Sequence, residues 1–292
     1  MRVAANGTEI YIDVDGPQLK LAAGRLRSHH TLIALHGGFG FDQGYLRAGL
    51  ASLSHLAQVV YLDLRCQGRS AIAEIQTCTL EQMADDVAAV CGVLGIERPV
   101  VFGHSAGGFV ALHLALRHPA LVGGLILCNT SPTMVQVADD GPPAPSLTER
   151  AGAEAAGVAA RLFGGDMSQE TLEAFNRLVL PFYGGPLHME VPGRVMALSD
   201  FKADVARYFF GELAGGYDLR PRLGEIVVPT LVVIGRYDWV CSPAAGRAIA
   251  AGIAKAELME FADSGHKGAD VSTACGAVAC GCAAVLAATP SI

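Results

Sequence analysis

The sequence predicts an α/β protein in which a mostly parallel sheet carries helices on both faces and a helical cap is inserted in the second half. Between residues 31 and 129, apolar runs of strand length alternate with segments of helical periodicity, which is typical of parallel sheets. The alternation then stops, and residues 147 to about 213 show helical patterns only. The chain has 292 residues, of which 51% are hydrophobic, so it can bury a large core.

The first half supplies most of the expected strands. Polar and apolar residues alternate over residues 9–16, which predicts a half-buried antiparallel strand at an edge of the sheet. Continuously apolar runs predict fully buried strands; they lie at residues 31–35, 59–64, 100–102 and 125–129. Helical spacing predicts helices between these strands; they are expected at residues 45–56, 80–94 and from 109 onward.

The second half begins with residues 139–146, a segment of Asp, Gly, Pro, Ala and Ser that cannot form regular structure. We assign residues 1–130 and 216–292 to an α/β core and residues 131–215 to the inserted cap. The alternation resumes with a strand at 230–235, a helix at 243–253 and a strand at 256–261. Most of the large apolar residues of the cap are expected to pack, and a few to line a pocket; they are Phe175, Leu178, Val179, Phe182, Tyr183, Phe201, Tyr208, Phe209 and Phe210.

A Gly-x-Ser-x-Gly motif, from Gly103 to Gly107, separates an apolar strand from a helix. In this setting the motif is typical of a sharp strand-to-helix turn that projects a serine hydroxyl at its apex. Gly103 and Gly107 provide room where any Cβ would collide. Ser105 is therefore a candidate nucleophile.

A serine hydroxyl needs a base and a carboxylate that orients the base. Asp238 follows the buried strand at 230–235, and His266 follows the strand at 256–261. Both residues therefore lie at the edge of the sheet where Ser105 emerges. The order Ser, Asp, His is the one described for hydrolases with a strand-turn-helix nucleophile.

Other histidines and acids fit these roles less well. His36 and His104 lie in tight glycine loops, where a local structural role is expected. Asp63 also ends a strand, but the nearby Arg65 predicts a turn held by a local ion pair. The remaining histidines lack a position at a strand end; they are His29, His30, His55, His113, His118 and His188.

A glycine-rich loop, residues 36–40, follows the buried strand at 31–35. Such a loop can bring bare N–H groups close to a ligand, and an acyl-transfer site needs two donors for the developing oxyanion. We expect these donors to be the amides of Gly38 and Ala106.

Together these segments resemble the α/β-hydrolase superfamily over nearly the whole chain, which implies an eight-stranded, mostly parallel sheet with a helical cap. The loop at residues 36–40 and the Asp-x-Arg segment at 63–65 are similar to those of proline iminopeptidases and their relatives. Phe39 stands where that family often has Pro, and Cys66 where it often has Gly. Residues 267–292 are dominated by Ala, Gly, Cys and Val, unlike the tail of these relatives, although a helix at 272–288 is still predicted.

The resemblance implies a serine hydrolase that cleaves a small carboxylic ester, lactone or N-terminal amide through an acyl-enzyme, without a metal or organic cofactor. Phe39, His104 and Trp239 are expected to contact the substrate. An iminopeptidase would also hold the free amine with an acidic cap residue, for which Glu212 is a candidate. Two alternatives stay open: a carbon–carbon bond hydrolase of the same fold, and a non-catalytic ligand-binding relative.

Composition restricts the partners and the location. The net charge of −7 and the absence of a Lys/Arg run argue against nucleic acid. The longest apolar region, residues 109–127, is interrupted by polar residues and Pro119, which argues against a membrane span. The first residues lack the apolar core of a signal peptide, and eight cysteines without such a signal favour reduced thiols. We therefore expect a cytoplasmic protein whose partner is a small molecule or short peptide; no oligomeric state is predicted.

Overall fold

The computed structural model describes residues 1–22, 25–138, 141–267 and 284–285. Its centre is an eight-stranded sheet with the order β1-β2-β6-β5-β7-β8-β9-β10. The strands are β1 (Arg2–Ala5), β2 (Thr8–Asp15), β5 (His30–Leu35), β6 (Ala57–Leu62), β7 (Val100–His104), β8 (Gly124–Cys128), β9 (Thr230–Gly235) and β10 (Ala256–Phe261). The antiparallel pairs of this sheet are β1 with β2 and β2 with β6. The other neighbouring strands are parallel. The predicted α/β fold class with a mostly parallel sheet is confirmed.

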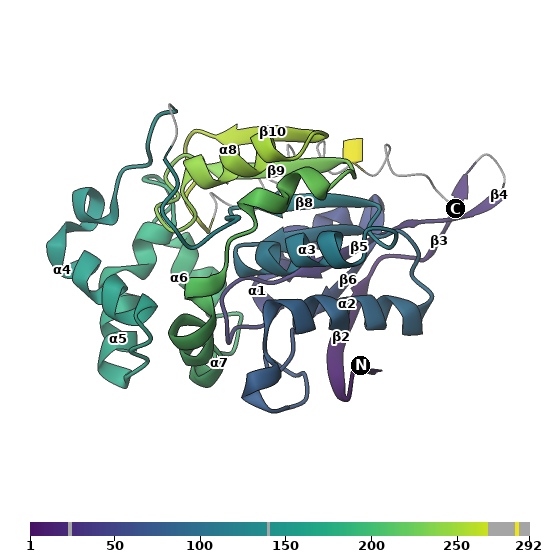
Figure 1. Cartoon of the computed structure of the whole chain (residues 1–292), viewed down its shortest axis with the longest axis horizontal. Coiled ribbons are helices and arrows are strands. Elements are labelled where there is room, and N and C mark those ends of the chain that lie inside the picture. The colour runs from purple at the N-terminus through teal and green to yellow at the C-terminus, as the bar shows by residue number, and fades with distance from the viewer. Residues whose placement is uncertain (23–24, 139–140, 268–283, 286–292) are drawn as a thin grey trace.

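Helices cover both faces of the sheet (Figure 1). They are α1 (Gly44–Leu50), α2 (Leu80–Leu94), α3 (Ala106–Arg117), α4 (Leu147–Phe163), α5 (Gln169–Leu178), α6 (Val191–Met196), α7 (Ala203–Tyr208) and α8 (Pro243–Gly252). Alternate residues of the central strands point to opposite faces, as the pleat of a strand requires: Ile33 packs in the core under α2, α3 and α8, whereas Leu32 packs under α1. None of the helices in the described ranges has both the length and the apolar composition needed to cross a membrane.

Helices α4 to α7 lie between β8 and β9 in the chain and form one group beside the sheet (Figure 1). No strand occurs among the described residues of this insertion, in agreement with the helical pattern of its sequence. The limits at residues 131 and 215 stay a prediction, because nothing in the fold tests them as domain boundaries.

The N-terminal part of the chain differs most from the prediction. A strand at β1 was not expected, and it places β2 second from the edge instead of at the edge. A separate hairpin, β3 (Leu19–Ala22) with β4 (Arg25–Ser28), was also not expected. The helix expected at 45–56 is α1 followed by a 3₁₀ turn at Ala51–His55. The helix predicted at 272–288 lies almost entirely outside the described residues.

Helix α2 shows how local sequence fixes an element. The hydroxyl of Thr79 accepts the N–H of Gln82 at 3.1 Å, which caps the first turn. Gly95 ends the helix in the left-handed conformation, with φ of 63°, where a residue without a Cβ is favoured. The predicted limits of this helix, 80 and 94, are those observed.

A buried ion pair joins α2 to the loop after β6. Arg65 and Asp86 form two hydrogen bonds of 2.7 Å, and both side chains are nearly inaccessible to solvent. The expectation that Arg65 would pair with Asp63 is wrong. The carboxylate of Asp63 instead accepts from the backbone and side chain of Arg69, because the turn after the strand carries the Arg65 side chain toward α2.

Replacing Asp86 by Ala should lower the free energy of unfolding by about 3–5 kcal/mol, because it leaves the Arg65 guanidinium buried without a counter-charge. Urea denaturation of the variant and the wild type measures this difference. Asp204→Ala, which removes an exposed ion pair with Arg207, is the matched control and should change stability by about 0.5 kcal/mol or less. Equal losses in the two variants would contradict the expectation.

Candidate active site

Ser105 occupies the turn between β7 and α3. Its backbone has φ of 51° and ψ of −121°, a combination that residues with a Cβ rarely adopt. Two close approaches enforce the turn: a Cβ on Gly103 would lie 2.6 Å from the carbonyl oxygen of Gly107, and a Cβ on Gly107 would collide with the carbonyl oxygen of Leu35. The Ser105 hydroxyl is thereby held at the carboxyl end of β7 and the N-terminus of α3.

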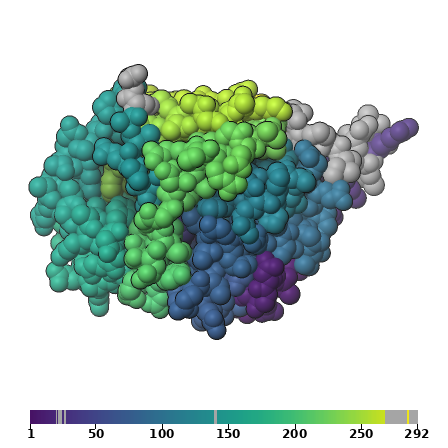
Figure 2. Space-filling view, in the orientation of Figure 1, coloured from purple at the N-terminus to yellow at the C-terminus, as the bar shows by residue number. Residues whose placement is uncertain are grey.

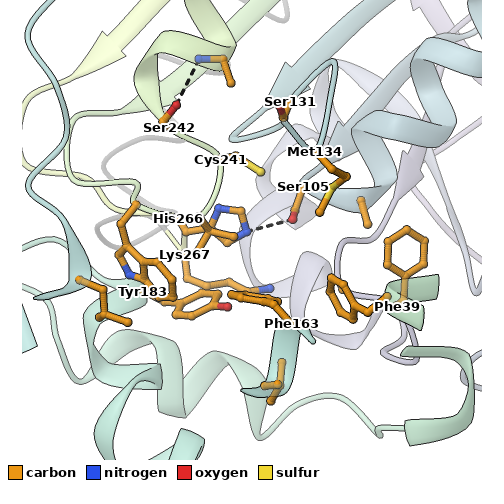
Figure 3. A pocket seen from close by; sticks show the side chains of 18 of the residues that line it. Phe39, Ser105, Ser131, Met134, Phe163, Tyr183, Cys241, Ser242, His266 and Lys267 are labelled. Carbon is orange, nitrogen blue, oxygen red and sulfur yellow. Dashed lines mark hydrogen bonds between the residues drawn. The ribbon is translucent and has the colours of Figure 1, made fainter. Parts of the chain in front are cut away.

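The structure brings Ser105, His266 and Asp238 together, although they are far apart in the chain. His266 Nε2 lies 2.9 Å from Ser105 Oγ (Figure 3), and His266 Nδ1 lies 2.8 Å from Asp238 Oδ2. A carboxylate can only accept, so Nδ1 carries the proton and Nε2 of the neutral ring is free to accept the Ser105 proton. This arrangement is suited to activation of a serine hydroxyl.

Asp238 is held by the backbone of its own loop. The side chain is fully buried, and its Oδ1 accepts the N–H groups of Val240 at 2.9 Å and Cys241 at 2.8 Å. These two hydrogen bonds fix the carboxylate so that Oδ2 faces the ring of His266. A buried carboxylate needs such partners, since desolvation otherwise disfavours its charge.

A chain of buried hydrogen bonds connects the loop after β5 to the loop that carries His266. The N–H of Gly37 donates to the Tyr45 oxygen at 2.6 Å, and Tyr45 Oη lies 2.7 Å from His104 Nδ1. His104 Nε2 lies 2.9 Å from the carbonyl oxygen of His266. Since a carbonyl only accepts, Nε2 donates and Nδ1 accepts the Tyr45 proton. Burial lowers the pKa of His104, which agrees with a neutral ring.

His104 therefore does not have the position expected for a substrate-binding residue. It does not line the cavity described below, and both of its ring nitrogens are engaged by protein atoms. The reason is that β7 ends at His104, whose side chain points into the protein, whereas the sharp turn at Ser105, with φ of 51°, projects the serine hydroxyl into the cavity. His104 positions the loop of His266.

Asn129 holds the same loop from β8. Its Nδ2 donates to the carbonyl oxygens of Gly265 at 3.1 Å and His266 at 3.0 Å, and its Oδ1 accepts the N–H of Gly235 at 2.9 Å. An amide can donate and accept at the same time, whereas a carboxylate in this position could only accept. Asn129 thus ties the ends of β8 and β9 to the histidine loop.

The loop at residues 36–40 presents amides toward the site. His36 Nε2 accepts the N–H of Leu64 at 3.1 Å, and the N–H of Gly40 donates to Gln67 Oε1 at 2.7 Å. The N–H groups of Gly38 and Phe39 have no acceptor among the described residues. Ala106, at the first position of α3, likewise has an N–H without an intrahelical acceptor. Both predicted oxyanion donors, Gly38 and Ala106, line the same cavity as Ser105.

This cavity, of about 1220 Å³, lies between the sheet edge and the insertion. Figure 2 shows an opening in the teal insertion through which yellow-green atoms from late in the chain are visible. Phe39 and Trp239, both expected to contact substrate, line the cavity. Phe39 stacks on Phe209 of the insertion, and Trp239 donates its indole N–H to the carbonyl oxygen of Phe182 at 2.9 Å.

Some of the predicted cap residues contribute to the cavity wall and others do not. Those that line it are Phe175, Tyr183, Phe201, Phe209 and Phe210. Leu178, Val179, Phe182 and Tyr208 do not line it. Glu212 is exposed and lies outside the cavity wall, so the structure does not place it where it could hold a substrate amine.

Arg150 of α4 connects the insertion to the loop of Asp238 through hydrogen bonds. Its guanidinium donates to the carbonyl oxygens of Phe182 at 2.9 Å, Gly184 at 2.8 Å and Tyr237 at 3.1 Å. Because Tyr237 directly precedes Asp238, this side chain couples the position of the cavity wall to that of the carboxylate.

Lys267 and Cys241 also line the cavity but were not singled out in the sequence. Figure 3 shows the Cys241 side chain beside Ser105, and burial raises the pKa of its thiol well above the ordinary value. The only available signals were adjacency to His266 for Lys267 and proximity to Asp238 for Cys241. Neither signal says which way a side chain points in a loop.

Comparison with known proteins identifies the fold independently. The family described as "alpha/beta hydrolase fold" matches residues 30–272. Among solved structures, the enol-lactonase from Burkholderia xenovorans LB400 is similar over 98% of this chain and 100% of its own, with 26% identity and a TM-score of 0.73.

Two curated relatives add different activities. The proline iminopeptidase PfmaB of Pestalotiopsis fici is 25% identical over 266 residues, which cover 88% of this chain and 92% of that protein. A protein of Pantoea ananatis named as a carbamate hydrolase, RutD, is 35% identical over 106 residues. That match covers only 36% of this chain and 38% of the relative.

Replacing Tyr45 by Phe should lower the free energy of unfolding by about 2 kcal/mol, because the N–H of Gly37 and Nδ1 of His104 lose a buried partner. Chemical denaturation measures the change. Tyr208→Phe is the matched control, since the Tyr208 hydroxyl makes a single long bond of 3.4 Å near the surface. Similar stability of the Tyr45→Phe variant and the wild type would show that the hydrogen-bond chain contributes nothing to the fold.

Proposed function

Since the chain belongs to the alpha/beta hydrolase fold family, we propose that it is a serine hydrolase that cleaves a small carboxylic ester or lactone through an acyl-enzyme. The observation that carries this proposal is the relay from Asp238 through His266 to Ser105, with distances of 2.8 and 2.9 Å, at the wall of a mostly apolar cavity. A hydroxyl, a base and an orienting carboxylate in this order are the requirements of nucleophilic acyl transfer.

The proposed reaction starts with attack of Ser105 Oγ on the substrate carbonyl while His266 Nε2 takes the hydroxyl proton. Asp238 stabilises the resulting imidazolium through the hydrogen bond at Nδ1. The N–H groups of Ala106 and Gly38 receive the oxyanion, and each such donor is worth roughly 3 kcal/mol in comparable sites. His266 then returns the proton to the leaving alcohol, and water releases the acyl group by the same steps in reverse order.

The lining of the cavity favours an ester or lactone over a peptide. An N-terminal peptide substrate carries an ammonium group, which needs a carboxylate when it is taken from water. The described residues of the cavity wall include no Asp or Glu side chain, while aromatic and aliphatic side chains form most of that wall. The similarity to an enol-lactonase also favours an ester or lactone. The similarity to a proline iminopeptidase is the reason to test a peptide-like substrate as well.

Ser105→Ala should reduce kcat for 4-nitrophenyl acetate by roughly 10⁶-fold, by analogy with deletion of other triad serines. Asp238→Asn should reduce it by roughly 10⁴-fold through the wrong histidine tautomer. Release of 4-nitrophenolate measures both, and Ser54→Ala, outside the cavity wall, is the control. Undiminished hydrolysis by Ser105→Ala would leave a non-catalytic binding protein as the better interpretation.

A second comparison separates the enzyme classes. Wild-type protein should hydrolyse 4-nitrophenyl butyrate and a small lactone with kcat/KM at least about 10²-fold above that for proline 4-nitroanilide, because leaving the substrate ammonium unpaired costs about 3 kcal/mol or more. Colorimetric and pH-stat assays provide the values. Turnover of the anilide alone would favour the iminopeptidase reaction, and cleavage of a vinylogous 1,5-diketone alone would favour a carbon–carbon bond hydrolase.

A further inference from the structure

The proposed mechanism does not use Lys267, the residue that follows His266. Its backbone N–H donates to the carbonyl oxygen of Tyr183 at 2.9 Å, which fixes the start of the side chain. Its Nζ lies 3.5 Å from the centroid of the Tyr45 ring. Figure 3 shows the side chain extending past His266 into the cavity, on the side of Ser105 and Phe39. The amine is therefore part of the wall that a substrate would touch.

The surroundings of this amine supply no counter-charge. Within the described part of the chain, no carboxylate forms an ion pair with Lys267. Apart from the His266 imidazole, Lys267 is the one ionisable cationic side chain among the described residues of the cavity wall, and no acidic side chain accompanies it there. Lys267 is partly exposed into the cavity, so its amine faces a mostly apolar wall without a counter-charge.

Four titratable groups near Lys267 offer it no negative charge at neutral pH. Burial lowers the pKa values of His104 and His36 and raises those of Tyr45 and Cys128, so none of these groups can neutralise an ammonium ion. The ring of Tyr45 offers a cation–π contact, which replaces only part of the lost hydration. Desolvation accordingly lowers the pKa of Lys267 to about 7, and a bound anion would restore its charge.

We propose that Lys267 Nζ is the subsite for a carboxylate carried by the substrate, so that the natural ester or lactone is anionic. This inference rests on the proposed function and names its substrate class. A carboxylate would supply the missing partner of the amine through a charge-assisted hydrogen bond, while the aromatic wall would bind the carbon chain between this carboxylate and the scissile carbonyl. The subsite would also fix the orientation of the substrate relative to Ser105.

Because Nζ and Ser105 share one cavity, a carboxylate on a short chain should reach both. The probes are the 4-nitrophenyl monoesters of succinate, glutarate and adipate, each compared with the neutral 4-nitrophenyl ester of an alkanoate of similar length. The readout is the ratio of kcat/KM for the anionic ester to that for the neutral one. In the wild type, at least one chain length should give a ratio above unity.

Lys267→Met keeps the length and apolar stem of the side chain and removes the charge. It should lower the ratio for the preferred chain length by about tenfold or more, mainly through KM, as expected for loss of a charged hydrogen bond. Lys267→Arg should recover part of the ratio. The matched control is Lys255→Met, an exposed lysine outside the cavity wall, which should leave the ratio unchanged.

Three results separate the possibilities. If the wild type hydrolyses neutral esters but prefers none of the anionic ones, the subsite is absent while the proposed function stands. If Lys267→Met lowers both kcat/KM values equally, Lys267 only packs against Tyr45 and the inference is overturned. If neither ester class is turned over by the wild type, or if Ser105→Ala retains full activity, the proposed function itself fails. A thermal melt of Lys267→Met shows whether the variant is folded.

Discussion

The backbone carbonyl of His266 is the point on which the geometry of the site depends. Two buried side chains donate to it, His104 from β7 and Asn129 from the end of β8. His266 lies in a loop, where no secondary structure fixes the backbone. The hydrogen bonds from His104 and Asn129 therefore fix the backbone position that determines where the imidazole ring lies. These hydrogen bonds hold the backbone of His266 where its imidazole contacts both Ser105 and Asp238.

The same constraint extends to the oxyanion loop. Tyr45 links His104 to the N–H of Gly37, so the loop with the candidate oxyanion donors and the loop with the base share one hydrogen-bond chain. Lys267 lies over the face of this tyrosine. The groups that would hold the oxyanion, move the proton and bind a substrate anion are therefore mechanically connected, although they come from three separate parts of the sequence.

The insertion completes the wall of the site. Arg150 attaches it to the acid loop through three backbone carbonyls, and Phe209 stacks on Phe39 of the oxyanion loop. These contacts place aromatic side chains around Ser105, where a low local dielectric strengthens each hydrogen bond of the relay.

The sequence by itself determined the fold class, the strand-turn-helix at Ser105 and the strand-end positions of Asp238 and His266. These features follow from local rules: apolar periodicity sets the strands and helices, and only glycine fits the tight turn around the serine. Tertiary structure decided what depends on side-chain direction in loops: that His104 points away from the cavity, that Arg65 pairs with Asp86 instead of Asp63, and that Lys267 points into the site. Such directions are set by contacts between segments more than a hundred residues apart or by the path of a turn, and periodicity carries no information about either.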